Sequence, residues 1–294
     1  MIKKFFSFVG VLSLICFSFY YTDSAVDIVK RNDPIMKEIE SVMGEYEKKS
    51  VDAVLTDNNI IPGVSGVKVD KDKSYEKMKK YGSFDEGLLV FEEVIPTIST
   101  SNTYDRYIVK GNNNKQSISL VFPITDTFYI DEIIKVLDEK GTKVTFFITK
   151  EIMFNDLDIL KKIYLNGHDI ELLSNNYSKK EIKDIKKMIK SFNGNNIKYC
   201  YSENENKELI NNCKTNKMHS IIPTIVTSNF PYGDIKNHVT SGSIISLNND
   251  INTIRELNSI INYLNQKGYN IISLEELLEE WQTSTRKYVS FFIS

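Results

Sequence analysis

From Ser117 onwards, short apolar runs alternate with stretches whose apolar residues recur at helical spacing. The apolar runs predict strands at 117–122, 143–149, 169–174, 197–202, 220–226, 242–247 and 270–274. The intervening stretches predict helices at 131–140, 156–166, 179–192, 251–267 and 274–281. Such repeated units imply a parallel sheet with right-handed crossovers, and their number favours closure into a barrel. In barrels of this kind, functional groups gather at the carboxyl ends of the strands.

The first third of the chain has a different pattern. Charged residues between helically spaced apolar ones predict a helical stalk over 33–54, and 72–81 predicts a short amphipathic helix. Residues 58–70 are rich in turn formers, whereas 88–98 predicts an extended segment. This is a small α+β segment in front of the barrel. The predicted parts are therefore a leader at 1–24, an N-terminal extracytoplasmic segment at 25–112, the barrel domain at 113–282 and a tail at 283–294.

The N-terminus carries an apolar run behind two lysines. Lys3 and Lys4 precede 17 residues without a charge, residues 5–21. This arrangement is typical of an export signal or a single membrane anchor. Asp23 is a poor neighbour for a cleavage site, so we favour a retained anchor, with secretion after cleavage as the alternative. The predicted location is the cell membrane with an extracytoplasmic domain, or the envelope if the signal is cleaved.

Charge and cysteine content narrow the function classes. The 294 residues carry a formal net charge of −2, which gives no electrostatic basis for binding nucleic acid. Beyond Cys16 in the apolar run, the cysteines are Cys200 and Cys213. Two are too few for a disulfide framework, and both a single bridge and two free thiols remain open. The absence of a C-x-x-C sequence argues against a structural zinc site.

The order of three segments carries a resemblance to a known family. KVTFFIT at 143–149, NGHDIELLS at 166–174 and KGYNIISLEELL at 267–278 follow one another with specific spacing. In these segments the chain resembles the polysaccharide deacetylases (NodB-homology, carbohydrate esterase family 4) over 117–281. The resemblance implies a distorted (β/α) barrel. Its enzymes remove acetyl groups from amino sugars of chitin, peptidoglycan or related glycans with a divalent metal, which polarises the amide and activates water.

The residues that this chemistry requires are replaced. In the family's T-F-D-D-G motif, the base and a metal ligand correspond to Pro123 and Ile124. The two histidines of the second motif correspond to Leu173 and Tyr177, and the histidine of the last motif corresponds to Asn248. No arginine stands near 201–204, and the only tryptophan, Trp281, is near the C-terminus. The resemblance therefore implies that catalysis and the zinc site are lost, so that no catalytic residue, metal or cofactor is expected.

Polar residues remain around the expected cleft. Asp126, Ser174, Asn176, Asn248 and Asp250 could contact a ligand, although Asn and Asp in loops are more often turn and capping residues. We expect Pro123, Ile124, Leu173 and Tyr177 to lie close together and to pack as one apolar plug. His168, His219 and His238 lack ligand spacing and are interpreted as structural or solvated.

The leading hypothesis is a catalytically inactive, envelope-anchored protein on a deacetylase-like barrel, which binds an envelope protein or a cell-wall glycan. One alternative is an active deacetylase, or another carbohydrate esterase, that acts through non-standard residues. No G-x-S-x-G sequence supports a relocated nucleophile. The second alternative is a structural envelope protein that acts through its N-terminal segment.

Overall fold

The computed structural model describes residues 17, 27–112, 116–174 and 176–281, which form two compact units. Within the described residues, unit 1 comprises 27–50, 65–94 and Trp281, and unit 2 comprises 51–64 and 95–280. The predicted boundary at 112/113 differs from this division, because residues 51–64 and 95–112 group with the barrel. The predicted anchor at 5–21, apart from Phe17, and the tail at 283–294 lie outside the described residues. No helix among the described residues is long and apolar enough to cross a membrane.

Unit 1 is built from two helices and a β-hairpin. The helices are α2 (Pro34–Tyr46) and α3 (Lys71–Lys79), and a 3-10 turn, η1, lies at Glu86–Leu88. The two strands, β3 (Gly66–Val69) and β4 (Phe91–Val94), pair in antiparallel orientation. Each helix begins at an aspartate whose carboxylate accepts a backbone N–H, Asp33 for α2 and Asp70 for α3. Their apolar faces meet in a core of Ile35, Ile39, Val69, Met78 and Leu89.

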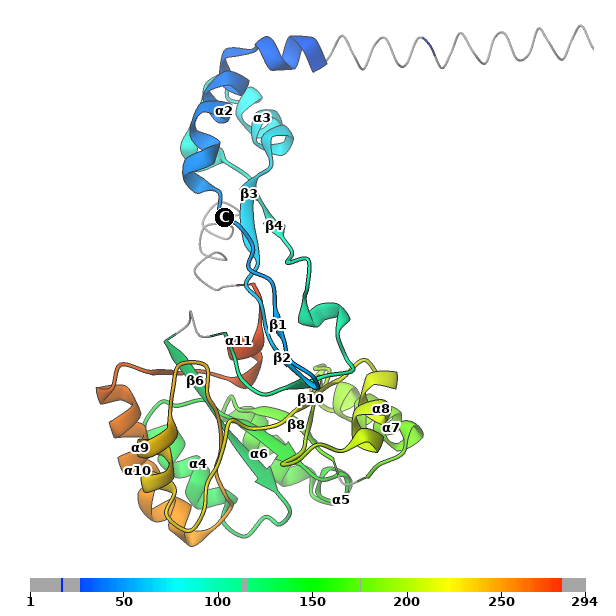
Figure 1. The fold of residues 1–294 in the computed structure, drawn as a ribbon, viewed down its shortest axis with the longest axis vertical. Coiled ribbons are helices and arrows are strands. Elements are labelled where there is room, and N and C mark those ends of the chain that lie inside the picture. The colour runs from blue at the N-terminus through cyan, green and yellow to red at the C-terminus, as the bar shows by residue number, and fades with distance from the viewer. Residues whose placement is uncertain (1–16, 18–26, 113–115, 175, 282–294) are drawn as a thin grey trace, which may run out of the picture. The chain divides into compact units, whose positions relative to one another are not determined.

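Unit 2 contains a curled, mostly parallel sheet (Figure 1). Its strand order is β1-β2-β5-β10-β9-β8-β7-β6-β12-β11, with β13 paired to β6. The strands are β1 (Val54–Leu55), β2 (Asn59–Ile61), β5 (Tyr107–Ile108), β6 (Ser117–Ile124), β7 (Thr145–Ile148), β8 (Asp169–Leu173), β9 (Tyr199–Tyr201), β10 (His219–Ile221), β11 (Ile225–Val226), β12 (Ile244–Ser246) and β13 (Asn270–Ile271). Only the β1–β2 pair is antiparallel among these described strands. The predicted α/β fold is confirmed, and the sheet is a curled half-barrel that is consistent with the expected distorted (β/α) barrel.

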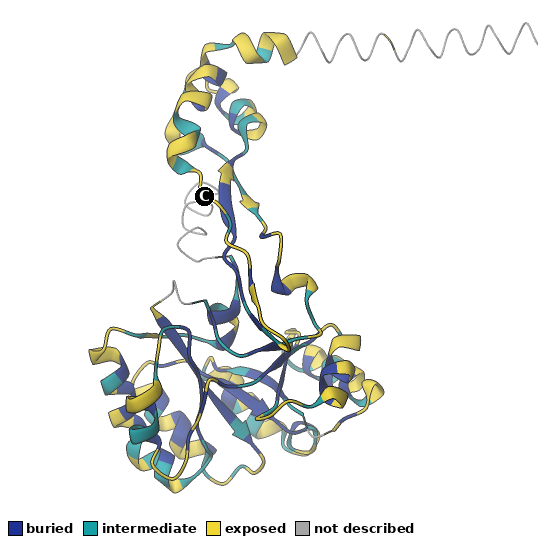
Figure 2. Cartoon of the chain, viewed as in Figure 1, coloured by how far each residue is buried: buried dark blue, intermediate teal, exposed yellow. Residues whose placement is uncertain are grey.

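Helices follow most of the strands and cover the sheet. They are α4 (Ile130–Glu139), α5 (Lys150–Asn155), α6 (Leu157–Leu165), α7 (Lys179–Asn193), α8 (Lys207–Thr215), α9 (Pro231–His238), α10 (Ile251–Gln266) and α11 (Leu274–Leu278), with a 3-10 turn η2 at Thr100–Asn102. The buried faces of α4 to α10 and one face of the sheet form the main core, and Figure 2 shows buried residues in dark blue. A second apolar cluster, which includes Val121, Phe147 and Tyr201, occupies the other face of the sheet.

Most predicted elements of the barrel are confirmed, and three kinds of difference stand out. The predicted helix over 33–54 ends at Tyr46, and the turn-rich stretch 58–70 contains strands β2 and β3. Helices α5, α8 and α9 were not predicted. These three helices are six to nine residues long.

A buried carboxylate holds the N-terminal part of unit 2 against its C-terminal end. Glu280 accepts hydrogen bonds from the backbone of Gly63 and Thr100, at 3.1 and 2.9 Å, and from the Ser99 hydroxyl. Glu280 is 9% exposed, so its charge is compensated by these donors rather than by water. The acceptor thereby joins three segments that are far apart in the sequence.

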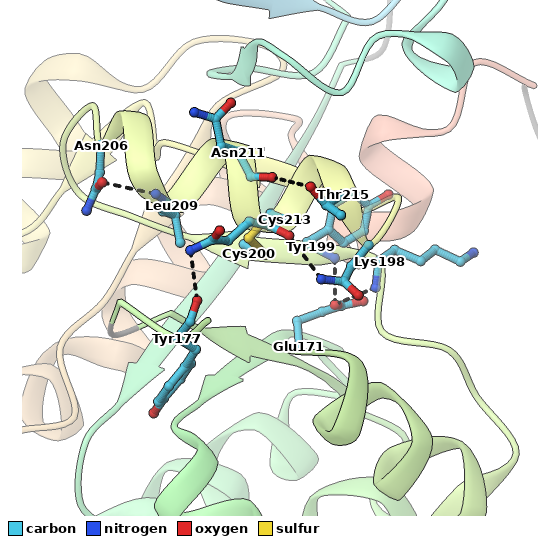
Figure 3. The surroundings of a disulfide bond; sticks show 12 residues. Glu171, Tyr177, Lys198, Tyr199, Cys200, Asn206, Leu209, Asn211, Cys213 and Thr215 are labelled. Carbon is cyan, nitrogen blue, oxygen red and sulfur yellow. Dashed lines mark hydrogen bonds between the residues drawn. A yellow bond between two sulfur atoms is a disulfide. The ribbon is translucent and has the colours of Figure 1, made fainter. Parts of the chain in front are cut away.

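Cys200 and Cys213 form a disulfide bond (Figure 3), which decides between the two states that the sequence left open. The bond links β9 to α8, with 13 residues of separation along the chain and 6.6 Å between the Cα atoms. Both cysteines are fully buried in the main core. The bridge fixes α8 against the sheet.

Candidate ligand site at the carboxyl ends of the strands

The positions that correspond to the family's catalytic motifs lie at the carboxyl ends of β6 and β8. Ile124 is in register with Ile148 of β7, which is in register with Leu172 of β8. Pro123 and Leu173 are therefore two strands apart and offset by two residues. Strand spacing and rise place their Cα atoms about 12 Å apart. The two motif positions assigned from the sequence therefore lie near the same edge of the sheet.

These positions do not form one plug. Ile124 and Tyr177 belong to the main core beneath the helices, whereas Leu173 packs against the cluster on the opposite face of the sheet. The reason is the alternation of side chains along a strand, which sends consecutive residues to opposite faces. Pro123 lies on the Leu173 face, in register with Phe147. The expectation of a single apolar plug is wrong.

Pro123 lies inside β6, rather than after the end of a strand as the sequence suggested. The Val121 carbonyl accepts a hydrogen bond from Leu247 N, at 2.9 Å, on the side of β12. Residues 121 and 123 point their backbone groups to the same side, and β12 ends at Ser246. The missing N–H of Pro123 therefore falls beyond the end of the β12 ladder, where no partner strand needs it.

Tyr177 occupies a histidine position of the motif with a role in the local structure. Its hydroxyl accepts a hydrogen bond from Lys150 N, at 3.0 Å, and donates to Glu151 Oε2, at 2.7 Å. Burial raises the pKa of the Tyr177 hydroxyl, so it remains protonated and able to donate. The Tyr177 hydroxyl therefore binds the first turn of α5, and both of these hydrogen bonds are made within the protein.

The polar residues of the second motif have separate environments. Ser174 Oγ is buried and has no hydrogen-bond partner among the described residues. Asn176 adopts a left-handed backbone with φ of 56°, and its Oδ1 accepts from Asn206 Nδ2 at 3.1 Å. Ser174 is thus the one residue of this pair with a buried side-chain oxygen that has no partner among the described residues.

The other three candidates stabilise their own loops. Asp126 Oδ1 accepts from Phe128 N at 3.0 Å and from Asn249 Nδ2 at 3.2 Å. Asn248 Nδ2 donates to Thr227 O at 3.1 Å, and Asp250 caps α10 by accepting from Thr253 N at 2.8 Å. These are the turn and capping roles that loop Asn and Asp residues commonly take.

The histidines lie away from this edge or in closed surroundings. His168 is buried at the amino end of β8, where its Nδ1 faces Val144 N at 3.4 Å, and burial lowers its pKa to about 4. His219 stacks on Tyr104 with ring centroids 4.4 Å apart, and burial likewise lowers its pKa to about 4. His238 Nδ1 lies 2.9 Å from Asp234 O in α9. Each contact is local, which agrees with a structural interpretation.

The family's metal does not fit these residues. Proline, isoleucine and leucine side chains offer no lone pair, and the Tyr177 oxygen is already engaged. Within the part of the chain that the structure describes, no cluster of three or more His, Cys, Asp or Glu residues could hold a metal ion. Tyr201 lies where the third motif was expected, and its hydroxyl shares a 2.8 Å hydrogen bond with Ser246 Oγ.

Two exposed aromatic residues at the same edge were not among the sequence candidates. Phe128 follows β6 and is 76% exposed, and Phe230 follows β11 and is 72% exposed. Strands β6 and β11 both neighbour β12, so both loops leave the same end of one short stretch of sheet. A polar residue flanks each in the sequence, but no sequence pattern distinguishes an exposed from a buried phenylalanine in such loops.

Part of unit 2 matches a known protein family. Residues 110–243 match the family model described as polysaccharide deacetylase. Within these residues the chain is similar to the polysaccharide deacetylases. The match lies within unit 2 and contains the strands that carry Pro123, Ile124 and Leu173.

Relatives extend beyond the deacetylase domain. YlxY of Bacillus subtilis is 24% identical over 95% of this chain and 98% of its own length. The structure of wild-type BA3943 from Bacillus anthracis, described as a CE4 family pseudoenzyme, has a TM-score of 0.64 and 24% identity, covering 86% of this chain and 97% of that one. Bacillus subtilis PdaA, a family 4 carbohydrate esterase, has a TM-score of 0.53 and 17% identity, over 60% of this chain and 85% of its own. BA3943 and PdaA therefore share the fold of this chain.

Proposed function

We propose that the protein is a catalytically inactive deacetylase-like protein of the cell envelope, which binds an envelope protein or a cell-wall glycan. The observation that carries the proposal is the environment of Ile124, at the position of a metal ligand. Ile124 is fully buried in the main core, where its side chain contributes packing and offers no group to a metal. BA3943, whose fold is similar, is itself described as a pseudoenzyme.

Binding would use the edge that carried catalysis in the family. Phe128 and Phe230 expose aromatic faces there, and Ser174 and Asn249 carry buried side-chain oxygens without partners among the described residues. Aromatic faces together with hydroxyl and amide groups suit sugar rings as well as protein side chains.

An envelope location is supported by the disulfide between Cys200 and Cys213 and by the basic and apolar N-terminus. Disulfides persist in oxidising compartments and are rare in the cytosol. In this proposal, residues 5–21 hold the protein in the membrane with both units outside. External protease should digest it in cells stripped of their wall, and recovery from the cytosol would contradict the location.

The decisive experiment measures metal content and acetate release together. The purified full-length protein should contain no stoichiometric zinc and should release no acetate from N-acetylated glycan oligomers. An active family 4 esterase, measured in the same assay as the positive control, should contain metal and should release acetate. One tightly bound metal per chain with acetate release would favour the alternative of an active enzyme. Binding to insoluble peptidoglycan, compared between the wild type and Phe128→Ala/Phe230→Ala, then tests the edge itself.

A further inference from the structure

A groove between α7 and the end of α8 collects lysines. Its volume is about 690 Å³, and α7 and α8 lie side by side in Figure 1. The lining residues are Lys179, Lys180, Lys183, Lys186, Lys187, Lys190, Asn196, Thr215, Asn216 and Lys217. We call this surface the lysine groove. It holds seven positive charges in a chain whose formal net charge is −2.

The lysines form a stripe along α7. Lys179, Lys183, Lys186 and Lys190 stand at i, i+4, i+7 and i+11, which places them on one face of a helix. The buried residues Ile182, Ile185 and Ile189 occupy an adjacent side of the helix, about 100° from the stripe. Like charges at these spacings destabilise a helix by about 0.2–0.5 kcal/mol per pair. The arrangement is thus unfavourable for the isolated fold.

Few carboxylates compensate these charges. Among the described residues, the ion pair of a groove lysine is that of Lys187 with Asp184, at 3.9 Å. Glu181, the nearest acidic residue at the start of α7, pairs instead with Lys150 at 2.7 Å, outside the groove. Among the described residues, Lys179, Lys183 and Lys190 make no ion pair, so these three lysines of the stripe can attract an anion.

The walls of the groove are fixed relative to each other. Lys186 Nζ donates to Asn216 O at 2.7 Å, and Asn216 Nδ2 donates to Lys179 O at 3.0 Å. The Cys200–Cys213 disulfide holds α8 to the sheet beneath (Figure 3). A surface that is held before binding loses less conformational entropy when a ligand arrives.

The residue types in the lining select among anions. Lysine is a point charge that suits phosphate, whereas planar recognition of carboxylates favours arginine, which the lining lacks. The lining has no aromatic residue on which a nucleobase could stack. It also has no apolar residue that could enter a bilayer, and it is concave.

We propose that the lysine groove binds a linear, base-free polymer whose repeating charge is phosphate. The α7 stripe from Lys179 to Lys190 spans about 16 Å, which is long enough to engage several phosphates in succession. This interaction does not depend on the loss of catalysis or on the edge that carries Phe128.

The test uses the full-length protein in phosphatidylcholine nanodiscs and inorganic polyphosphate as the probe. The groove variant is Lys179→Gln/Lys183→Gln/Lys187→Gln/Lys190→Gln, which leaves the Lys186 hydrogen bond intact. The control, Lys135→Gln/Lys161→Gln/Lys207→Gln/Lys236→Gln, removes the same charge from exposed lysines elsewhere on unit 2. We expect the groove variant to bind at least about tenfold more weakly, with a shallower dependence on salt, because fewer counterions are released. The control should bind like the wild type.

Competition distinguishes the possible sources of phosphate. Labelled polyphosphate should be displaced by unlabelled polyphosphate more effectively than by an oligothymidylate of equal phosphate content or by phosphatidylglycerol vesicles. Equal loss of binding in the groove and control variants, or no binding by the wild type, would overturn the proposal. Preferential displacement by the oligonucleotide or by the vesicles would overturn it in favour of a nucleic acid or a membrane surface.

Discussion

Ile124 and Leu173, which occupy two metal-ligand positions of the deacetylase family, face opposite sides of the same sheet. Ile124 is aligned through Ile148 with Leu172, so the next residue, Leu173, points the other way. Ile124 packs in the main core, and Leu173 packs against the cluster around Phe147 and Tyr201. The two side chains therefore pack in separate apolar clusters. Substituting each with the corresponding metal ligand of the family should change the free energy of unfolding by different amounts.

The first prediction compares Ile124→Asp with Leu173→His. Ile124→Asp loses a fully buried apolar side chain and places a carboxyl in a dry core, so the free energy of unfolding should fall by about 3–5 kcal/mol. Leu173 is only partly buried, and Leu173→His should cost about 1 kcal/mol. Urea unfolding followed by circular dichroism measures both. Equal costs would contradict the assignment of the two residues to different cores.

The second prediction concerns the Tyr177 hydroxyl. Tyr177→Phe keeps the ring but leaves Lys150 N without its acceptor and Glu151 without a donor. The free energy of unfolding should fall by about 1–2 kcal/mol. Tyr164→Phe, at a residue 40% exposed, is the matched control and should change it by less than about 0.5 kcal/mol. An unchanged stability of Tyr177→Phe would mean that the hydroxyl is available for another role.

The sequence predicted the order of the barrel elements because each predicted strand or helix carries its own pattern. Residues 145–148 are all buried and read as a strand without further context. The side of the sheet to which Ile124 and Tyr177 contribute could not be predicted, because it depends on the register between β6, β7 and β8. The Cys200–Cys213 bond likewise depends on how α8, itself too short to recognise, meets β9.

The third prediction concerns that disulfide. Closing a loop of this length in the unfolded chain should stabilise the native state by about 3 kcal/mol. Reduction, or Cys200→Ser/Cys213→Ser, should therefore lower the unfolding temperature by about 6–12 °C. Cys16→Ser is the control, and it should retain the full sensitivity to reductant. If the unfolding temperature of the wild type were the same with and without reductant, the two cysteines would not form a disulfide bond.

The last prediction follows from Glu171, a buried carboxylate of β8. Its Oε2 accepts from Lys198 N and Tyr199 N, both at 2.8 Å, at the amino end of the sheet. Burial raises the pKa of Glu171 well above its ordinary value, despite these two hydrogen bonds. Asp169 and Glu275 also raise the Glu171 pKa through their negative charge, and the Lys186 ammonium is the neighbouring cation.

The sign of the pH dependence follows from proton uptake. Above the ordinary carboxyl pKa of about 4.3, the unfolded chain has released the proton that folded Glu171 still holds. The free energy of unfolding therefore decreases as pH rises from there through the raised folded pKa. Glu171→Gln keeps an acceptor oxygen for both backbone groups and has no proton to lose. The variant should become more stable than the wild type as pH rises, by about 1.4 kcal/mol for each unit by which the Glu171 pKa is raised.

Urea unfolding at a series of pH values from about pH 5 to about pH 8 measures this difference, which should grow as the pH rises. Glu139→Gln provides the control, because Glu139 is exposed at the end of α4 and is not among the groups that shift the pKa of Glu171. Its effect on stability should stay within about 1 kcal/mol across these pH values. If Glu171→Gln were less stable than the wild type at the higher pH values, the Glu171 carboxylate would be ionised and stabilised in the folded protein. The cost of burying its charge would then be smaller than the cost of losing it.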